Sequence, residues 1–213
     1  MRSGWRPGAR RHRSPPIAAV LFKAVQFGVL AIFIWYGFDL RRKHGMTPLA
    51  LPWLTRVMKV VSCVVVVLYV YVLWAVHELV WTDVLALVFT TSGAALVRAA
   101  KQALGDSHTW TGYCMEAPTL VVSGIYAYLR HPLYTGVYLF EIGALWTFVP
   151  RLDMLPVWGV VLAGICLLYA MSFNATMAAL ETRRMTRRFG PEFEAYRERV
   201  RAFIPLRRRP GAA

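Results

Sequence analysis

The residues best suited to chemistry lie in residues 123–136, a polar and aromatic segment between two long apolar segments. It contains the adjacent pair Arg130 and His131, followed by Pro132. Proline lacks an amide hydrogen and has a φ angle near the helical value, which favours the first position of a helix. It also disfavours the α region for the preceding residue, so we expect His131 on a bend at the mouth of a helix. An imidazole placed there can bind a ligand or transfer a proton, although Arg130 and His131 are equally suited to anchor lipid phosphate at the interface.

A carboxylate, Glu181, is the second candidate. It directly follows the uncharged apolar residues 157–180 and precedes a segment rich in arginine. A basic helix lying on lipid would explain the arginines, but it does not explain a carboxylate at this junction. Glu141 lies inside another apolar segment, where a charge is costly unless it faces the helix bundle or a polar pocket.

The composition indicates that a bilayer surrounds these residues. Of the 213 residues, 57% are hydrophobic and 17% are charged, and the mean hydropathy is +0.45. A soluble domain of this length has no core large enough for so much apolar surface. The formal net charge of +14 comes from lysines and arginines at the start, at 41–59 and after Glu181; such clusters predict contact with anionic lipid headgroups and no nucleic-acid binding. Cys63, Cys114 and Cys166 have neither metal-ligand nor disulfide spacing.

Apolar segments long enough to cross a bilayer predict an all-α, polytopic membrane protein of about five transmembrane helices. We expect Thr82 or Asp83 to cap the third of them. The polar segment between the third and fourth helices is interpreted as a lid, a cofactor loop or an ordinary surface connection. The expected spans are 17–38, 57–76, 84–104, 132–149 and 157–180, with a basic loop at 39–56, the polar segment at 104–120 and a short turn at 150–156.

The residues after Glu181 are expected to form a basic helical tail. The helix should continue through Phe189, stop at Gly190 and restart at Pro191. An odd number of spans places this tail and the N-terminal arm on opposite sides. Most lysines and arginines then lie on the side of the tail, so the positive-inside rule predicts a cytoplasmic C-terminus, in a bacterial inner membrane or an endomembrane. The disordered basic arm expected at residues 1–16 would then lie on the opposite, non-cytoplasmic side, which conflicts with this rule.

Two blocks of residues, each beside an apolar span, are Gly124, Tyr126, Arg130, His131, Pro132, Tyr134 and Gly136, and then Glu181, Phe189, Gly190, Tyr196, Val200, Ile204 and Pro205. Together they resemble the isoprenylcysteine carboxyl methyltransferase and phospholipid methyltransferase superfamily, which comprises integral membrane enzymes that use S-adenosylmethionine. The resemblance covers roughly residues 95–206. The chain departs from the family pattern at Ile125 and Arg201, where the family has proline, and at Thr182, where the family has a second glutamate.

The resemblance implies that residues 124–136 and the tail fold over each other at the cytoplasmic surface and enclose S-adenosylmethionine. The cationic groups of this cofactor suit a carboxylate, its carboxylate suits a basic group, and its adenine suits aromatic side chains. Glu181 would pair with the cationic end, and Arg130 or His131 would hold the carboxylate. The implied cofactor-binding residues are Tyr126, His131, Pro132, Tyr134, Gly136, Glu181 and Tyr196, and the implied catalytic residues are Arg130, His131 and Glu181.

The chain then divides into four parts. Residues 1–16 form the arm, and residues 17–95 form the transmembrane helices on the acceptor side. Residues 96–206 form the methyltransferase-like, cofactor-binding region, and residues 207–213 form a basic tail. The substrate should arrive through the membrane, because the acceptor side consists of apolar helices.

The implied function is methyl transfer from S-adenosylmethionine to a lipophilic acceptor, most readily a prenylcysteine-type carboxylate, with a phospholipid amine or a small thiol left open. A carboxylate needs no general base, whereas a thiol or an amine needs one. The candidates for that base are His131, His108 and the pair His77 and Glu78. One alternative is a membrane NADPH-dependent sterol-type reductase, whose tail is similar but which has Asn where this chain has Leu133. The other is a non-catalytic lipid-binding scaffold, which accounts for the arginines alone.

Overall fold

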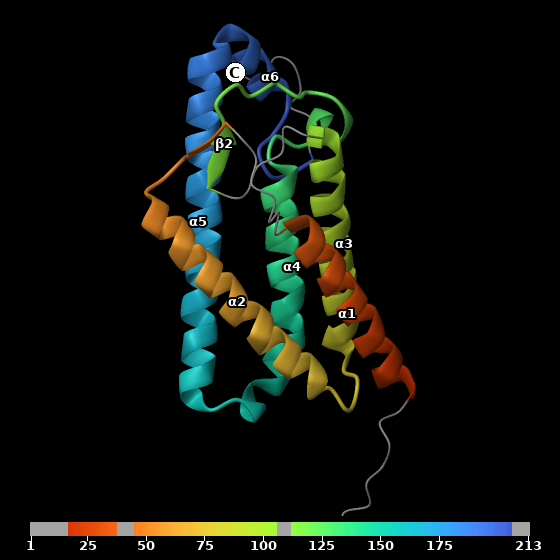
Figure 1. Ribbon diagram of the computed structural model, residues 1–213. Helices are drawn as coiled ribbons and strands as arrows, with labels where there is room; N and C mark the ends of the chain where they lie inside the picture. Colours follow the sequence, from red (N-terminus) through yellow and green to blue (C-terminus); the bar gives the residue numbers. More distant parts are fainter. Residues whose placement is uncertain (1–16, 38–44, 106–111, 206–213) are drawn as a thin grey trace, which may run out of the picture.

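The computed structural model describes residues 17–37, 45–105 and 112–205. These residues are mostly helical, as the sequence predicts, and the long helices lie side by side in one bundle (Figure 1). In chain order the elements are α1 (Ile17–Gly37), β1 (Met46–Pro48), α2 (Pro52–Trp74), α3 (Trp81–Leu104), β2 (Tyr113–Met115), η2 (Gly124–Ala127), α4 (Pro132–Phe148), η3 (Val149–Met154), α5 (Val157–Phe189) and α6 (Pro191–Arg199).

Four helices, α1, α2, α3 and α5, are long and apolar enough to cross a membrane. Their length and composition confirm the prediction of an integral membrane protein. The fourth predicted span, α4, has 17 residues and is not among them, so the described residues give four candidate spans where we expected about five. Even so, α1 begins and α5 ends at opposite ends of the bundle (Figure 1).

The helix starts differ from the predicted ones for local reasons. Helix α2 begins at Pro52, because proline suits the first helical turn. Helix α3 has Val80 as its N-cap, and the Asp83 carboxylate accepts a hydrogen bond from the Val80 amide at 2.9 Å. The expectation that Thr82 or Asp83 is the N-cap is therefore wrong: Asp83 caps the helix from its third position.

Helix α5 is one uninterrupted helix that joins the apolar span to the basic segment. It runs from Val157 to Phe189 and carries Glu181 beyond the apolar part. Gly190, with φ of 52°, ends it, and Pro191 starts α6. The predicted continuation, stop and restart are confirmed. The expected turn at 150–156 is mainly the 3-10 helix η3.

A short antiparallel strand pair joins two segments for which the sequence predicted only loops. Strand β1 pairs with β2 so that Met46 lies opposite Met115, and the Thr47 hydroxyl donates to the Cys114 carbonyl at 3.3 Å. Strands of three residues show no alternating pattern that could predict them. Parts of these loops, at 38–44 and 106–111, and the arm and basic tail predicted at the ends of the chain lie outside the described residues.

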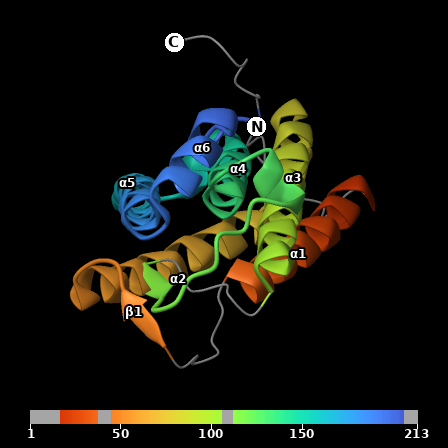
Figure 2. The same cartoon turned by 90° about the horizontal axis from the view of Figure 1, so that it is seen from above.

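Glycines hold α4 tightly against α3. A Cβ atom on Gly93 would lie 2.6 Å from the Gly136 carbonyl oxygen, and one on Gly143 would lie 2.6 Å from the Thr90 amide. Small residues at such crossings let two backbones approach closely, which stabilises helix pairs in membranes. Figure 2 shows α4 between α3 and α5, with α2 passing along their side. The glycine contact therefore fixes the position of the residues that begin α4.

A buried ion pair holds the opposite end of the bundle, at the start of α3. The Arg151 guanidinium donates to both oxygens of Asp83, each at 2.8 Å, and the two side chains are 5% and 2% exposed. Arg151 also donates to the backbone carbonyls of Thr147 and Glu78. The guanidinium is thus paired with a carboxylate and two carbonyls, which stabilises the α3–η3 contact.

Candidate functional site

His131 lies on the bend that the sequence predicts, directly before the first residue of α4. It is the N-cap of that helix, with φ of −124° and ψ of 57°, and Pro132 follows as the first helical residue. The imidazole is only 8% exposed. The interpretation of His131 as a lipid anchor is therefore wrong, because the ring is turned into the protein.

The imidazole faces two residues of α5. Its Nε2 atom lies 2.9 Å from the Thr182 hydroxyl oxygen, which is hydrogen-bond distance. Its Nδ1 atom lies 3.8 Å from Glu181 Oε2. The structure therefore brings together the two candidates that the sequence singled out, His131 and Glu181.

Glu181 remains accessible although its neighbours are buried. Its side chain is 35% exposed. Burial of the rest raises the pKa of the Glu181 carboxyl to about 7, and a hydrogen bond with the hydroxyl of the buried Tyr134 opposes this rise. A partly exposed carboxylate with one buried side suits a cationic ligand, because the ligand can reach it and water is partly excluded.

His131 is neutral at physiological pH. Burial lowers its pKa to about 3, and the positive charge of Arg130 acts in the same direction. The 3.8 Å contact with Glu181 is therefore not an ion pair, and it is also too long for a hydrogen bond. The polar partner of the imidazole is the Thr182 hydroxyl.

Thr182 is a site residue that the sequence did not assign. In the sequence it stands only as a departure from the family pattern, where a second glutamate is expected. In the structure its hydroxyl is the hydrogen-bond partner of His131. A glutamate at position 182 would place a second carboxylate beside the buried imidazole. This chain has a threonine there, and its uncharged hydroxyl pairs with a neutral histidine.

The segment before α4 pairs with the tail through the backbone. The Arg130 amide donates to the Arg201 carbonyl, and the His131 amide donates to the Ala202 carbonyl, both at 3.0 Å. The Arg130 side chain adds a bond from Nε to the Val200 carbonyl at 2.9 Å. These contacts confirm that the two motif blocks fold over each other, and they draw Arg130 inward.

A tyrosine adds a second tie between the blocks. The Tyr196 hydroxyl donates to the Tyr126 carbonyl at 2.7 Å. Burial raises the pKa of Tyr196 to about 12, partly opposed by Arg130, so the hydroxyl keeps its proton at physiological pH. Burial also raises the pKa of Tyr126. Tyr196 therefore holds the loop in place, and this role differs from the predicted cofactor contact.

Gly136, which was predicted to bind the cofactor, packs against α3. A Cβ atom at this position would lie 2.8 Å from the Gly93 carbonyl oxygen and 2.8 Å from Cγ2 of Val97. Helix packing against α3 thus accounts for this glycine. Of the other predicted residues, Pro132 starts α4, and Tyr134 is buried beside Glu181.

Residues 84–175 match the model of the isoprenylcysteine carboxyl methyltransferase family. The chain is also 30% identical over 131 residues to the protein-S-isoprenylcysteine O-methyltransferases of Mus musculus and Homo sapiens. The chain is therefore similar to this family over α3, α4 and the apolar part of α5. The aligned part is 61% of this chain and 43% of each relative, so the chain spans less than half the length of the curated relatives that it matches.

The match to the isoprenylcysteine carboxyl methyltransferase family covers α3, α4 and the apolar part of α5. It ends before Glu181 and the tail, which complete the site. The matched part of the chain therefore contains His131 and the helix contacts beneath it, whereas the last part of α5, beyond the match, carries Glu181 and Thr182.

Positive charge is concentrated around Arg130. Arg130, Arg197 and Arg201 line a cavity of about 280 Å³ together with the backbone of 200–204. Arginine keeps its charge at any physiological pH. An anionic group can therefore be held in this cavity.

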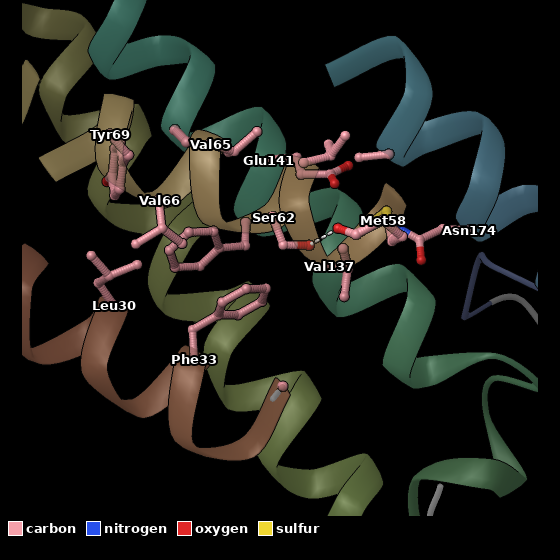
Figure 3. Close-up of a pocket in the computed structure, with 15 residues that line it drawn as sticks. Leu30, Phe33, Met58, Ser62, Val65, Val66, Tyr69, Val137, Glu141 and Asn174 are labelled. Carbon is pink, nitrogen blue, oxygen red and sulfur yellow. Dashed lines mark hydrogen bonds between the residues drawn. The ribbon is translucent and has the colours of Figure 1, made fainter. Parts of the chain in front are cut away.

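An apolar cavity of about 110 Å³ lies deeper in the bundle and is called the central cavity below (Figure 3). Helices α1, α2, α4 and α5 all contribute to its wall, and nearly all of the lining is hydrophobic. In Figure 3, Glu141 and Asn174 lie towards one side, and Leu30 and Tyr69 lie towards the other. The cavity suits a hydrocarbon chain, because apolar surface is favourably transferred into it.

Other candidate residues lie elsewhere. His77 and Glu78, considered as a general-base pair, follow α2 at the end of the bundle that carries Arg151, which contacts the Glu78 carbonyl. His108 lies outside the described residues. Strand β2, which the sequence treated as loop, reaches α5 near Glu181, because the Arg184 side chain donates to the Met115 carbonyl at 3.4 Å. Only this end of the 104–120 segment is seen beside the site.

Proposed function

We propose that this chain is an integral membrane methyltransferase that transfers a methyl group from S-adenosylmethionine to a prenylcysteine-type carboxylate. One observation carries the proposal: the partly exposed Glu181 carboxylate faces the buried, neutral His131 at the end of the bundle that adjoins an apolar cavity. The two curated relatives, named protein-S-isoprenylcysteine O-methyltransferases, support this reaction class.

The residues of the site fit S-adenosylmethionine. When bound, this cofactor supplies an electrophilic methyl group on a sulfonium and leaves as a neutral thioether. Glu181 would balance the positive end, since its carboxylate is accessible and partly desolvated. Arg130 would hold the carboxylate, because His131 is neutral and Arg130 faces an arginine-lined cavity. Tyr126 and Tyr134 would form walls beside Glu181.

A carboxylate acceptor suits the protonation state of His131. A histidine with a pKa of about 3 is a weak base and is poorly matched to remove a proton at neutral pH. A thiol or an amine would need such a base, whereas an ionised carboxylate attacks without one. The site therefore aligns its substrates and excludes water, and proton transfer is not required of it.

For topology we propose five spans, counting α4 together with η3, and a cytoplasmic C-terminus. The alternating directions of α1 to α5 in Figure 1 support an odd number of crossings. The proposed division assigns residues 17–95 to the acceptor side and residues 96–206 to the cofactor side. Its support is that α1 and α2 supply more than half of the central cavity. The basic residues of the tail would then lie against anionic headgroups.

A labelling experiment tests the function. The purified chain in lipid nanodiscs is incubated with methyl-tritiated S-adenosylmethionine and either N-acetyl-S-farnesylcysteine or its carboxamide. We expect a base-labile methyl ester on the first compound alone, because the carboxamide has no nucleophilic oxygen anion. Equal labelling of both compounds, or of neither, would reject a carboxylate acceptor, and binding of NADPH in place of S-adenosylmethionine would move the chain to the reductase class.

A further inference from the structure

The hydroxyl of Thr182 is bonded differently from those of its neighbours on α5. Threonines inside helices commonly donate to the backbone carbonyl four residues earlier. Thr176 and Thr186 do so, at 2.8 Å and 3.0 Å. Among the described residues the Thr182 hydroxyl has no such bond, and its one partner there is Nε2 of His131 at 2.9 Å. The proton of this hydroxyl is therefore either directed at the imidazole or without an acceptor in the described part of the chain.

The imidazole of His131 is held in one orientation. It is only 8% exposed and packs against the rings of Tyr134 and Phe203, whose centroids lie 5.8 Å and 5.6 Å from its own. Its two nitrogens therefore keep different surroundings. Nε2 faces the Thr182 hydroxyl, and Nδ1 faces the Glu181 carboxylate at 3.8 Å.

These surroundings decide which nitrogen carries the proton. A neutral imidazole has a proton on one nitrogen, and the other nitrogen accepts a hydrogen bond. With the proton on Nε2, the Thr182 hydroxyl accepts, its own proton has no acceptor among the described residues, and the lone pair of Nδ1 faces a carboxylate. With the proton on Nδ1, the hydroxyl donates to Nε2, and an N–H group faces Glu181. The second arrangement alone pairs donors with acceptors at both nitrogens, and unpaired buried groups are costly.

We propose that Thr182 is a positioning residue: its hydroxyl donates to Nε2 of His131 and so keeps the proton of the imidazole on Nδ1, opposite the Glu181 carboxylate. In this form the positive end of the N–H dipole is directed at Glu181 Oε2. The hydroxyl of Tyr134 acts on the same carboxylate. Both donors belong to buried side chains, so they orient Glu181 from within and leave its exposed side for a ligand.

This assignment gives His131 a role other than acid–base catalysis. The lone pair of Nε2 is occupied by the hydroxyl, and Nδ1 already carries a proton, so neither nitrogen is free to remove a proton from an acceptor. The N–H group also favours the ionised form of Glu181, which opposes the effect of burial on its pKa. The effect on ligand binding rests on the proposed function, in which Glu181 pairs with the cationic end of S-adenosylmethionine. The position of the proton does not depend on that function.

The position of the proton is tested without any cofactor. The full chain, isotopically labelled in its histidines, is reconstituted in lipid bilayers and measured by magic-angle-spinning NMR at neutral pH. Protonated and unprotonated ring nitrogens give well separated signals, and correlation with the ring carbons distinguishes Nδ1 from Nε2. The chain has five histidines, so the spectrum of His131→Gln identifies the signals of His131. We expect a protonated Nδ1 and an unprotonated Nε2.

Three substitutions at position 182 separate the donor from the shape of the side chain. Thr182→Ser keeps the donor, so the NMR signals should be unchanged and the Kd for S-adenosylmethionine, measured by calorimetry, should stay within about twofold. Thr182→Val keeps the shape without the donor, so a signal of protonated Nε2 should appear and the Kd should rise about fivefold, as one lost hydrogen bond implies. Thr182→Glu offers an ionised acceptor alone, so Nε2 should be protonated.

Thr186→Val is the matched control. It removes a half-buried hydroxyl from the same helix, one turn further on, and this hydroxyl bonds to the backbone of α5. The NMR signals of His131 and the Kd should both be unchanged in this variant.

Several results would overturn the proposal. One is a protonated Nε2 in the unaltered chain, and another is a proton on both nitrogens. A loss of affinity in Thr182→Ser equal to that in Thr182→Val would show that the hydroxyl does not position the imidazole. A lower Tm of Thr182→Val with unaltered NMR signals would make Thr182 a purely structural residue. A chain with the expected signals that binds no S-adenosylmethionine would reject the proposed function and leave the position of the proton established.

Discussion

Replacing Glu181 by glutamine tests the electrostatic part of the proposed site. The change keeps the shape of the side chain and removes one charge. A unit charge about 4 Å from a cation contributes about 4 kcal/mol at the dielectric of a protein surface region. Glu181 is 35% exposed, so water competes for part of this interaction. We therefore expect a loss of about 2 kcal/mol, or about 30-fold in the Kd for S-adenosylmethionine.

The assay is calorimetric titration of the purified chain in detergent with S-adenosylmethionine. Arg188→Gln is the control, because it also removes one charge from α5, about two turns beyond Glu181, and its side chain is exposed. It should change the Kd by less than about twofold. Both variants should retain the unfolding temperature of the unaltered chain, since neither side chain is needed for the apolar contacts of the bundle.

Equal and small losses of affinity in the two variants would refute this reasoning. Glu181 would then be a surface carboxylate among arginines. Its position opposite His131 would contribute to the structure and not to cofactor binding. A loss of affinity together with a lowered Tm would point to the same conclusion, because the glutamine would then have disturbed the packing of Tyr134 and not a ligand contact.

Three further substitutions or conditions test the structure around the site. Thr182→Val leaves the buried Nε2 atom of His131 without its partner and should reduce the free energy of unfolding by about 1–3 kcal/mol, measured by thermal unfolding. The folded-state pKa of His131 is about 3 and its ordinary value is 6.5, so the unfolded chain binds more protons between these values. The contribution of His131 to the free energy of unfolding is therefore complete above about pH 6.5 and is lost as the pH falls towards 3. In an acid titration, the difference in stability between the unaltered chain and His131→Gln should shrink over this pH range. Gly136→Ala places a methyl group 2.8 Å from the Gly93 carbonyl oxygen and should lower stability by about 1–3 kcal/mol, whereas Ala at the unconfined Gly164, where a Cβ would meet nothing within 4 Å, should not.

The sequence predicts well those features that depend on neighbouring residues. Gly190 and Pro191 end one helix and start the next as expected, because a glycine with positive φ and a proline at a first helical position act locally. Pro132 fixes the start of α4 and the bend at His131 for the same reason. The long apolar segments predict the membrane helices, because the thickness of a bilayer sets their length.

The sequence predicted fewer of the features that depend on contacts between residues far apart in the chain. The role of the Thr182 hydroxyl depends on its hydrogen bond with the imidazole 51 positions earlier in the chain. No local sequence pattern predicts such a pair. The two strands escaped prediction because each has three residues and pairs with a partner far along the chain. The close contact of Gly136 with α3 was not predicted, since it depends on Gly93, 43 positions earlier in the chain. The pairing of the two motif blocks was expected only through the family resemblance.

The backbone pairing between the loop before α4 and the tail also has a consequence in time. The bond between Arg130 and Val200 spans 70 positions of the chain. A ribosome adds about 5–20 residues per second, so roughly 4–14 seconds separate the synthesis of these two residues. During this interval α4 has been made, yet the amides of Arg130 and His131 lack their carbonyl partners. The candidate site is therefore assembled late, and a nascent chain that stalls between residues 190 and 199 contains α1 to α5 but lacks the backbone pairing of Arg130 and His131.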